Sequence, residues 1–402
     1  MNFKLFIAYI SLLHAGPILN LFGLIPGTRV FPITAVGHLL MVVVTFRRFL
    51  NSGVPRRLSI LDTLVIAFAL WSAASFILYY QNGNPSDIRA YFYGVHMYLL
   101  PIFGYFSIKA LSRDDQSRVL QFALRAYVLL FTMGIVIWWA RPEFYTSFHR
   151  NVMLGDSDLD EWKVYARLQS YLGSTTVGLS SGVAIILAIV LPMGVITRCA
   201  ILALSLVCSV LSYQRGGIIG AIMATFFFLA APGTSRIIRT IGVSFFVFLA
   251  VLVLPFLVAE SENGLTHYFS REEDFGRAFE SRSGYPNGAR YIAEFPFGVG
   301  LGGSGGAAYN AGWVGWGEVV DANFMRIAAD LGIQGVLLFL LIMGFAVRSS
   351  IKTSRIPGFA VIIAIYAIIC LGTNVFDGHI SPHMFWIILG IADTAPNNRP
   401  QS

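Results

Sequence analysis

Residues 59–80 read SILDTLVIAFALWSAASFILYY, a run in which Asp62 is the only charged residue. About 20 apolar residues, in a helix that rises about 1.5 Å per residue, cross the hydrocarbon core of a bilayer. Runs of this kind recur along the chain, whose 402 residues are 56% hydrophobic and only 12% charged. Soluble domains are about a quarter charged, so the sequence predicts an all-α polytopic membrane protein.

The apolar runs predict about twelve transmembrane helices in one integral membrane domain over residues 1–402. The first run has little charge ahead of it and no small-residue cleavage site behind it, so we expect it to stay in place as a helix. The predicted spans cover residues 3–23, 29–46, 59–80, 90–108, 119–140, 171–195, 198–213, 216–232, 238–259, 323–347, 357–373 and 381–394.

Basic residues distinguish the two sets of loops between these spans. Fifteen of the 28 Lys and Arg residues fall in one set, with few acids among them. Cytoplasmic loops are enriched in Lys and Arg, so this set and both termini are predicted to be cytoplasmic. The net charge of +7 then reflects topology, and nucleic acid is not an expected partner. The basic residues of the cytoplasmic set are Lys4, Arg47, Arg48, Arg56, Arg57, Lys109, Arg113, Arg118, Arg198, Arg236, Arg239, Arg348, Lys352, Arg355 and Arg399.

Metal, disulfide and nucleotide chemistry are not indicated by the sequence. The 3 cysteines lie in or beside apolar runs without paired spacing, which argues against disulfides and structural zinc. The HxxxH pattern of His379 and His383 is interrupted by Pro382, and no HExxH, P-loop, nucleophile elbow or dinucleotide fingerprint occurs. We therefore expect no metal and no cofactor.

Two segments on the predicted outer side exceed a simple turn. They are residues 141–170 and a large loop over residues 260–322, near the C-terminal third of the chain. Loops this long are usually functional or disordered, and the aromatic residues of the second argue for order. Within it, Trp313 and Trp316, with Tyr285 and Tyr309, could stack on sugar rings or simply pack the loop.

The first candidate site is the segment Ser212–Gly217, at the outer junction of two apolar runs. Its Arg215 lies near membrane depth, where a charge normally has a partner or a task, and a guanidinium binds phosphate through two hydrogen bonds. Gly216 and Gly217 would let the backbone turn tightly and approach a ligand. The alternative is an arginine that extends to the interface beside a glycine turn.

Two further arginines lie in segments that the same reasoning selects. Arg167 stands before the sixth span, where it could bind an anion or anchor the interface beside tyrosines. Arg290 begins a short helix that should end before Pro296, and the glycine run that follows, which includes Gly300, could offer free N–H groups to an anion. A flexible hinge is an equal alternative for that run.

The last candidate segment returns the large loop to the membrane. Asp321 or Asn323 could cap the helix that starts there, whose N-terminus favours anions. Arg326 and Asp330 are four residues apart and could pair on one face of that helix. Asp321 could alternatively serve as a general base.

Together these segments resemble the O-antigen ligase and O-antigen polymerase superfamily of bacterial envelopes, chiefly over residues 160–345. The resemblance rests on the order of short motifs: Arg167, the Ser-Arg-Gly type motif around Arg215, Arg290 with its Pro-x-Gly-x-Gly stretch, and Asn323-Phe324 with Gly332 and Gly335 after them. It implies a GT-C-like polytopic fold in the bacterial inner membrane, with the large loop and the active site in the periplasm.

The resemblance also implies an activity. Such a protein would polymerise undecaprenyl-pyrophosphate-linked oligosaccharide repeat units of an O-antigen, capsule or exopolysaccharide, with inversion and without a metal. Arg215, Arg290 and Arg167 would hold the donor pyrophosphate, and Asp321 or Glu318 could act as base. The expected binding residues are Arg167, Gly216, Gly217, Gly300, Asn323, Arg326, Trp313 and Trp316.

Two alternatives to a polymerase remain open. Ligases of this superfamily carry histidine immediately before the asparagine, where this chain has Ala322, so a polymerase is favoured over a ligase that transfers glycan to lipid A core or protein. A polysaccharide transporter or flippase is disfavoured because the predicted spans, apart from Arg125 and Asp62, are nearly uncharged. Expected partners are the lipid-linked glycan, a glycan acceptor, a chain-length regulator and the bilayer.

Overall fold

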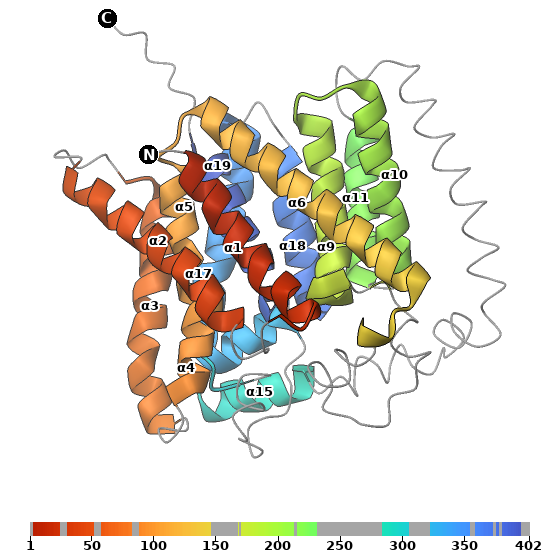
Figure 1. The fold of residues 1–402 in the computed structure, drawn as a ribbon. Coiled ribbons are helices and arrows are strands. Elements are labelled where there is room, and N and C mark those ends of the chain that lie inside the picture. Colours follow the sequence, from red (N-terminus) through yellow and green to blue (C-terminus); the bar gives the residue numbers. More distant parts are fainter. Residues whose placement is uncertain are drawn as a thin grey trace, which may run out of the picture.

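The computed structural model describes residues 3–24, 30–51, 58–82, 88–145, 168, 170–212, 215–230, 284–304, 322–353, 358–372, 375–377 and 380–394. Every regular element in these ranges is helical (Figure 1). Within the described residues, four helices are long and apolar enough to cross a membrane, and shorter apolar helices pack with them. The protein is therefore a helical membrane protein. The four are α1 (Phe3–Leu21), α3 (Ile60–Asn82), α6 (Arg113–Ala140) and α17 (Asn323–Thr353).

Most of the described residues of the predicted spans lie in helices. The sixth span, predicted over residues 171–195, is too long, because its helix ends at Val190 and residues 191–194 are not helical. The ninth, residues 238–259, lies outside the described residues. The remaining long elements are α2 (Val30–Asn51), α9 (Gly173–Val190), α10 (Val195–Leu211), α11 (Arg215–Ala230), α18 (Gly358–Gly372) and α19 (Ser381–Ala392). Nearly all of α19 is buried, as expected for a helix that is apolar on every side.

The prediction that the fourth span is one continuous helix over residues 90–108 is wrong. The structure has α4 (Ile88–Gly94), one turn of π-helix, η2 (Val95–Leu99), and then α5 (Ile102–Ile108). The N–H of Leu100 bonds the carbonyl of Val95, five residues back, at 2.9 Å. Pro101 follows and has no N–H for the helical ladder, which explains the break.

One end of the bundle, here called the Lys109 end, is held by charge. Lys109 Nζ lies 2.6 Å from Asp62 Oδ1 and 2.5 Å from Asp393 Oδ2. The hydroxyl of Tyr105 lies within hydrogen-bond distance of both carboxylates, 2.9 Å from Asp62 Oδ1 and 3.0 Å from Asp393 Oδ2. These bonds join the start of α3 to the ends of α5 and α19, so Asp62 belongs to an ion-paired helix end rather than to the middle of a span.

The opposite end, here called the α15 end, carries the helix α15 (Gly284–Glu294), which ends before Pro296 as predicted. In Figure 1, α15 lies across the bottom of the bundle. The loop 295–304 that follows does not stay on the surface. It enters the bundle, where Leu301 N–H bonds the hydroxyl of Ser75 in α3 at 3.2 Å.

The helix α17 bends sharply within its length. Gly332 has φ of 71° and ψ of −173°, which are not helical values. The indole N–H of Trp71 donates to the carbonyl of Leu331 at 2.7 Å, just before the bend. The bend divides α17 into a first half at the α15 end and a second half that continues to the Lys109 end.

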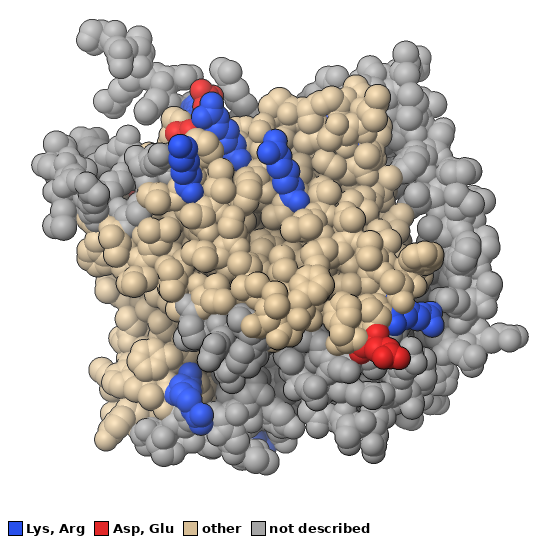
Figure 2. Space-filling model, in the orientation of Figure 1, with Lys and Arg blue, Asp and Glu red and all other residues tan. Residues whose placement is uncertain are grey.

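Charged side chains avoid most of the visible lateral surface. Figure 2 shows Lys, Arg, Asp and Glu mainly toward the top and bottom of this face, with a broad uncharged region between them.

The helix α6 begins where its local sequence favours a helix N-terminus. The Ser112 side chain accepts the N–H of Asp115, and Asp114 adds a second acid to the first turn. Arg125 is exposed on this helix.

Candidate functional site

The loop that enters the bundle at the α15 end surrounds a buried carboxylate. Asp330, in the first half of α17, is fully buried. Its Oδ1 accepts bonds from the N–H and the hydroxyl of Ser304, at 2.9 and 2.6 Å, and its Oδ2 accepts the N–H of Gly302 at 3.2 Å. Its backbone carbonyl accepts the N–H of Gly300 at 2.9 Å. One residue of α17 thus organises the whole loop.

Glycines allow this loop to pass close to neighbouring backbones. Gly300 and Gly302 have φ of 92° and 75°, in the left-handed region that favours glycine. A Cβ on Gly300 would lie 2.4 Å from the Cβ of Tyr79, and one on Gly302 would lie 1.9 Å from the carbonyl oxygen of Ala90. Both the conformation and the space therefore require glycine.

The expectation that the glycine run offers free N–H groups to a substrate anion is wrong for residues 298–304. Each N–H in this range bonds within the protein. The anion at the centre of the loop is the protein's own Asp330 carboxylate. Gly300, predicted to bind substrate, instead has a structural role, because its N–H is occupied and its Cα packs against α3.

The predicted pairing of Arg326 with Asp330 is confirmed. Arg326 Nε lies 3.9 Å from Asp330 Oδ2, and both side chains are 0% exposed. Burial of an unpaired charge is costly, so the guanidinium and the loop donors together keep the carboxylate in place. Arg326, predicted among the substrate-binding residues, therefore lies inside the α15 end.

Arg290, by contrast, is accessible. It lies on α15, with a side chain that is 50% exposed and an Nε 3.9 Å from Glu294 Oε1. Exposed pairs of this kind contribute only about 0–1 kcal/mol, so Glu294 restrains the guanidinium weakly. The next residue, Tyr291, is fully buried and packs with Val299 and Ala329. A fixed helix thus presents Arg290 at the surface of the α15 end.

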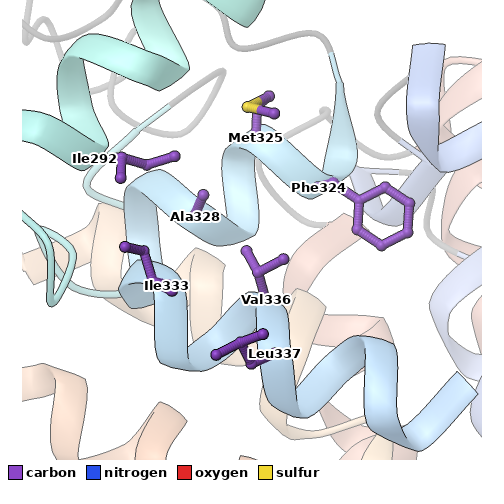
Figure 3. A pocket seen from close by; sticks show the side chains of 7 residues that line it. All are labelled: Ile292, Phe324, Met325, Ala328, Ile333, Val336 and Leu337. Atoms are coloured by element: carbon purple, nitrogen blue, oxygen red, sulfur yellow. The ribbon is translucent and has the colours of Figure 1, made fainter.

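An apolar pocket lies between α15 and the bend of α17. Its volume is about 140 Å³. In Figure 3, side chains from both halves of α17 and from α15 surround it. Its walls carry no charged side chain, although Arg290 and Arg326 each stand within two residues of a wall residue in sequence. The lining residues are Ile292, Phe324, Met325, Ala328, Ile333, Val336 and Leu337.

The segment around Arg215 has a different local structure from the one expected. The helix α11 begins at Arg215, so Gly216 and Gly217 lie in a helix and not in a tight turn. A Cβ on Gly217 would lie 2.6 Å from the Cα of Gly178 in α9. Small residues let neighbouring membrane helices approach closely, and Gly217 therefore serves the packing of α9 on α11. The Arg215 side chain lies outside the described residues.

Chain positions beside two predicted motifs meet in the structure. The N–H of Leu168 donates to the carbonyl of Leu211 at 2.8 Å. Leu168 follows Arg167 in sequence, and Leu211 precedes the segment 212–217. The backbone just after Arg167 is thus bonded to the backbone just before the segment 212–217, and Arg167 itself lies outside the described residues.

Several predicted residues at the end of the large loop are not described, namely Asp321, Glu318, Trp313 and Trp316. Asn323 is described, and its predicted role as an N-cap is wrong. It is the first residue of α17, and its side-chain oxygen accepts the N–H of Phe376 at 3.3 Å. Asn323 is fully buried, as is Ala322 before it, so its amide holds η6 (Val375–Asp377) against α17.

A group of buried aromatic polar residues was not predicted at all. His383 Nδ1 lies 2.8 Å from the Tyr9 hydroxyl oxygen and 3.3 Å from His38 Nε2. The ring of His96 lies with its centroid 4.6 Å from that of His38 and 6.1 Å from that of His383. These four residues, here called the histidine cluster, come from α1, α2, η2 and α19 and are all buried.

The histidine cluster lies about midway along the bundle. His383 precedes Asp393 of the Lys109 end by ten residues of α19, a rise of about 15 Å at about 1.5 Å per residue. That is about half the thickness of bilayer hydrocarbon, which is about 30 Å. Ionisable residues at such depth are expensive and commonly functional, and π-helical turns such as η2, which carries His96, occur often at functional sites.

Sequence spacing could not reveal this cluster. The HxxxH pattern pairs His383 with His379, four residues away. In the structure, the partners of His383 lie 345 and 374 residues away along the chain. The available signal was the presence of His38 and His96 inside apolar runs. Among the residues that the structure describes, no three or more His, Cys, Asp or Glu side chains are grouped so as to hold a metal ion.

No protein-family model matches this chain, and no curated protein matches it either. The functional argument therefore depends on the residues and on their placement. The helix α15, which carries Arg290, packs on α17, and the helix α11, which begins at Arg215, packs on α9 and α18.

Proposed function

We propose that the protein is a bacterial inner-membrane glycosyltransferase with a twelve-span, GT-C-like fold. It would polymerise undecaprenyl-pyrophosphate-linked repeat units of an O-antigen, capsule or exopolysaccharide on the periplasmic face. The observation that carries the proposal is Arg290, half-exposed on a helix that lies across one end of an apolar bundle. A cation at the end of an apolar bundle suits a lipid-linked donor. The tail of such a donor lies in the bilayer, and its pyrophosphate lies at the bilayer surface.

The proposed sidedness follows from the two ends of the bundle. Lys109, a member of the basic set predicted to be cytoplasmic, lies at the end opposite α15. In the proposal the α15 end is therefore periplasmic, and both termini are cytoplasmic. No nucleotide is needed there, because a lipid-pyrophosphate donor is already activated.

The proposed reaction forms one bond and breaks another at the same carbon. The hydroxyl oxygen of the acceptor attacks the anomeric carbon of the donor from one side, while the bond to the pyrophosphate oxygen breaks on the other, so the configuration inverts. Arg290 and Arg215, with Arg167, stabilise the negative charge that develops on the departing lipid pyrophosphate. The hydroxyl proton passes to the Asp321 carboxylate or to that pyrophosphate.

The test uses purified protein with lipid-linked repeat units and no other acceptor. A ladder of products, each longer by one repeat, is the expected result, read by gel or mass spectrometry. The ligase alternative gives no ladder and transfers glycan only when lipid A core or an acceptor protein is added. That outcome would replace the polymerase proposal with the ligase one.

The histidine cluster favours a second candidate function, a transporter or flippase. The predicted spans are nearly uncharged, which argued against transport, but a buried Tyr9–His383–His38 contact at mid-depth is the kind of polar group that lines a pathway. If the protein moves lipid-linked glycan, His383→Leu should slow translocation of a fluorescent lipid-linked sugar in liposomes at least fivefold. His14→Leu, which removes a buried histidine bonded to Tyr171 outside the cluster, is the matched control. Absence of translocation by the wild-type protein contradicts this candidate.

A further inference from the structure

The apolar pocket exists because α17 bends at Gly332. The first half of the helix contributes Phe324, Met325 and Ala328, and the second half contributes Ile333, Val336 and Leu337. A straight helix would carry these two sets along one line, whereas the bend at Gly332 brings residues of both halves to the lining of one pocket (Figure 3). The pocket is thus an inside corner of the main chain that Ile292 of α15 closes from a third side.

The position of the pocket matches the boundary between lipid headgroups and hydrocarbon. The helix α15 is amphipathic, with Tyr291 fully buried and Arg290 and Glu294 exposed, as expected for a helix that lies in the interface. On the α17 side of the pocket, Ile333 and Leu337 are 44% and 55% exposed. One wall therefore belongs to the interface and the other to the apolar lateral surface.

The size of the pocket restricts its occupant. A closed apolar cavity of about 150 Å³ accepts a guest the size of benzene. This pocket has a similar volume, about 140 Å³, and is partly open where Ile333 and Leu337 are exposed. A short, branched hydrocarbon unit fills such a space better than the length of an unbranched acyl chain.

Two cations belong to the same helices as the pocket walls, although neither lines the pocket. Arg290 precedes Ile292 by two residues on α15, and Arg326 follows Met325 directly on α17. Arg290 is half-exposed and can meet a headgroup, while Arg326 is buried with Asp330. A molecule with an anionic head joined directly to an apolar, branched tail would match the exposed Arg290 and the apolar pocket.

We propose that this pocket binds an isoprene unit of the carrier lipid close to its pyrophosphate. The inference rests on the proposed function for the identity of the carrier, and it adds the site that selects an isoprenoid tail. Arg290 would contact the pyrophosphate while the tail enters the bend of α17. The pocket then fixes the depth at which the scissile sugar–phosphate bond is presented.

Two substitutions fill the pocket in different ways. Ala328→Leu adds bulk from the buried wall, and Leu337→Trp adds it from a residue that is already half-exposed, so the second variant should fold even if the first does not. Gly344→Leu is the matched control. It adds the same side chain to the exposed surface of the same helix outside the pocket, where a new Cβ meets nothing within 4 Å.

The experiment measures binding to the full-length protein in nanodiscs without any glycan. Geranylgeranyl pyrophosphate, an unbranched alkyl pyrophosphate of equal chain length and inorganic pyrophosphate are compared by native mass spectrometry. We expect the wild-type protein and Gly344→Leu to bind the isoprenoid at least tenfold more tightly than the alkyl compound. We expect Ala328→Leu and Leu337→Trp to lose at least tenfold in affinity for the isoprenoid.

Equal binding of the isoprenoid by the pocket variants and the control would overturn the inference, and so would equal binding of both chains by the wild-type protein. A diazirine-bearing isoprenoid pyrophosphate can be cross-linked to the wild-type protein to locate its binding site. We expect labelling between Met325 and Leu337. Labelling elsewhere would contradict the site. Binding without polymerisation would refute the proposed function alone. Polymerisation with pocket-independent binding would refute this inference alone.

Discussion

Arg290→Ala should slow glycan polymerisation by at least about a hundredfold while the protein still inserts and accumulates. Loss of one donor that stabilises transition-state charge typically costs about 10²–10³ in rate. The side chain is half-exposed and paired only weakly with Glu294, so its removal should leave the fold intact. Ladder formation from lipid-linked repeat units measures the rate, and thermal unfolding in nanodiscs measures stability.

Two variants sharpen this test. Glu294→Gln removes the only acid whose pairing with Arg290 the structure records among its described residues, and it should polymerise at nearly the wild-type rate. Arg290→Lys retains the charge but loses the planar two-pronged donor, so an intermediate rate is expected. Full-length polymer from Arg290→Ala at the wild-type rate would remove Arg290 from the site.

Asp330→Ala should destabilise the protein by about 3–5 kcal/mol, the usual cost of removing one partner from a buried ion pair. The substitution also deprives Ser304 and Gly302 of their acceptor, and each buried donor left unsatisfied costs about 1–3 kcal/mol. Thermal unfolding in nanodiscs should show a lower Tm. Hydrogen exchange should become faster at the N–H groups of residues 300–304.

A double variant identifies the cause of this loss. If the cost comes from the buried Arg326 charge, Arg326→Met in the Asp330→Ala background should recover part of the lost stability. If it comes from the loop donors alone, the second substitution will recover nothing. Wild-type stability of Asp330→Ala would contradict the role of this carboxylate as the centre of the loop.

Local sequence signals predicted local structure well. Apolar runs about 20 residues long marked the helices, and the end of α15 before Pro296 followed from the restricted backbone before proline. The spacing of Arg326 and Asp330 predicted their contact on one helix face, which the structure confirms. Each of these features depends on residues within a few turns of one another.

Two interpretations failed because the same residues had partners elsewhere in the chain. The glycine run was expected to bind a foreign anion, and the N–H groups of Gly300, Gly302 and Ser304 instead bond to Asp330. Gly217 was expected in a ligand-binding turn, and it packs instead against Gly178 of another helix. In both cases glycine was correctly recognised as a site of close approach, but the approaching group could not be identified from spacing.

The sequence by itself determined a helical membrane protein, the approximate position of its helices and the arginines that stand at their ends, because hydrophobic length and helical periodicity are local properties. Only the tertiary structure decided that Gly332 bends α17 around an apolar pocket, that Asp330 fills the glycine loop, and that Tyr9, His38, His96 and His383 meet inside the bundle. The physical reason is that these contacts join elements up to 374 residues apart, and the packing of several helices at once selects which buried groups become neighbours.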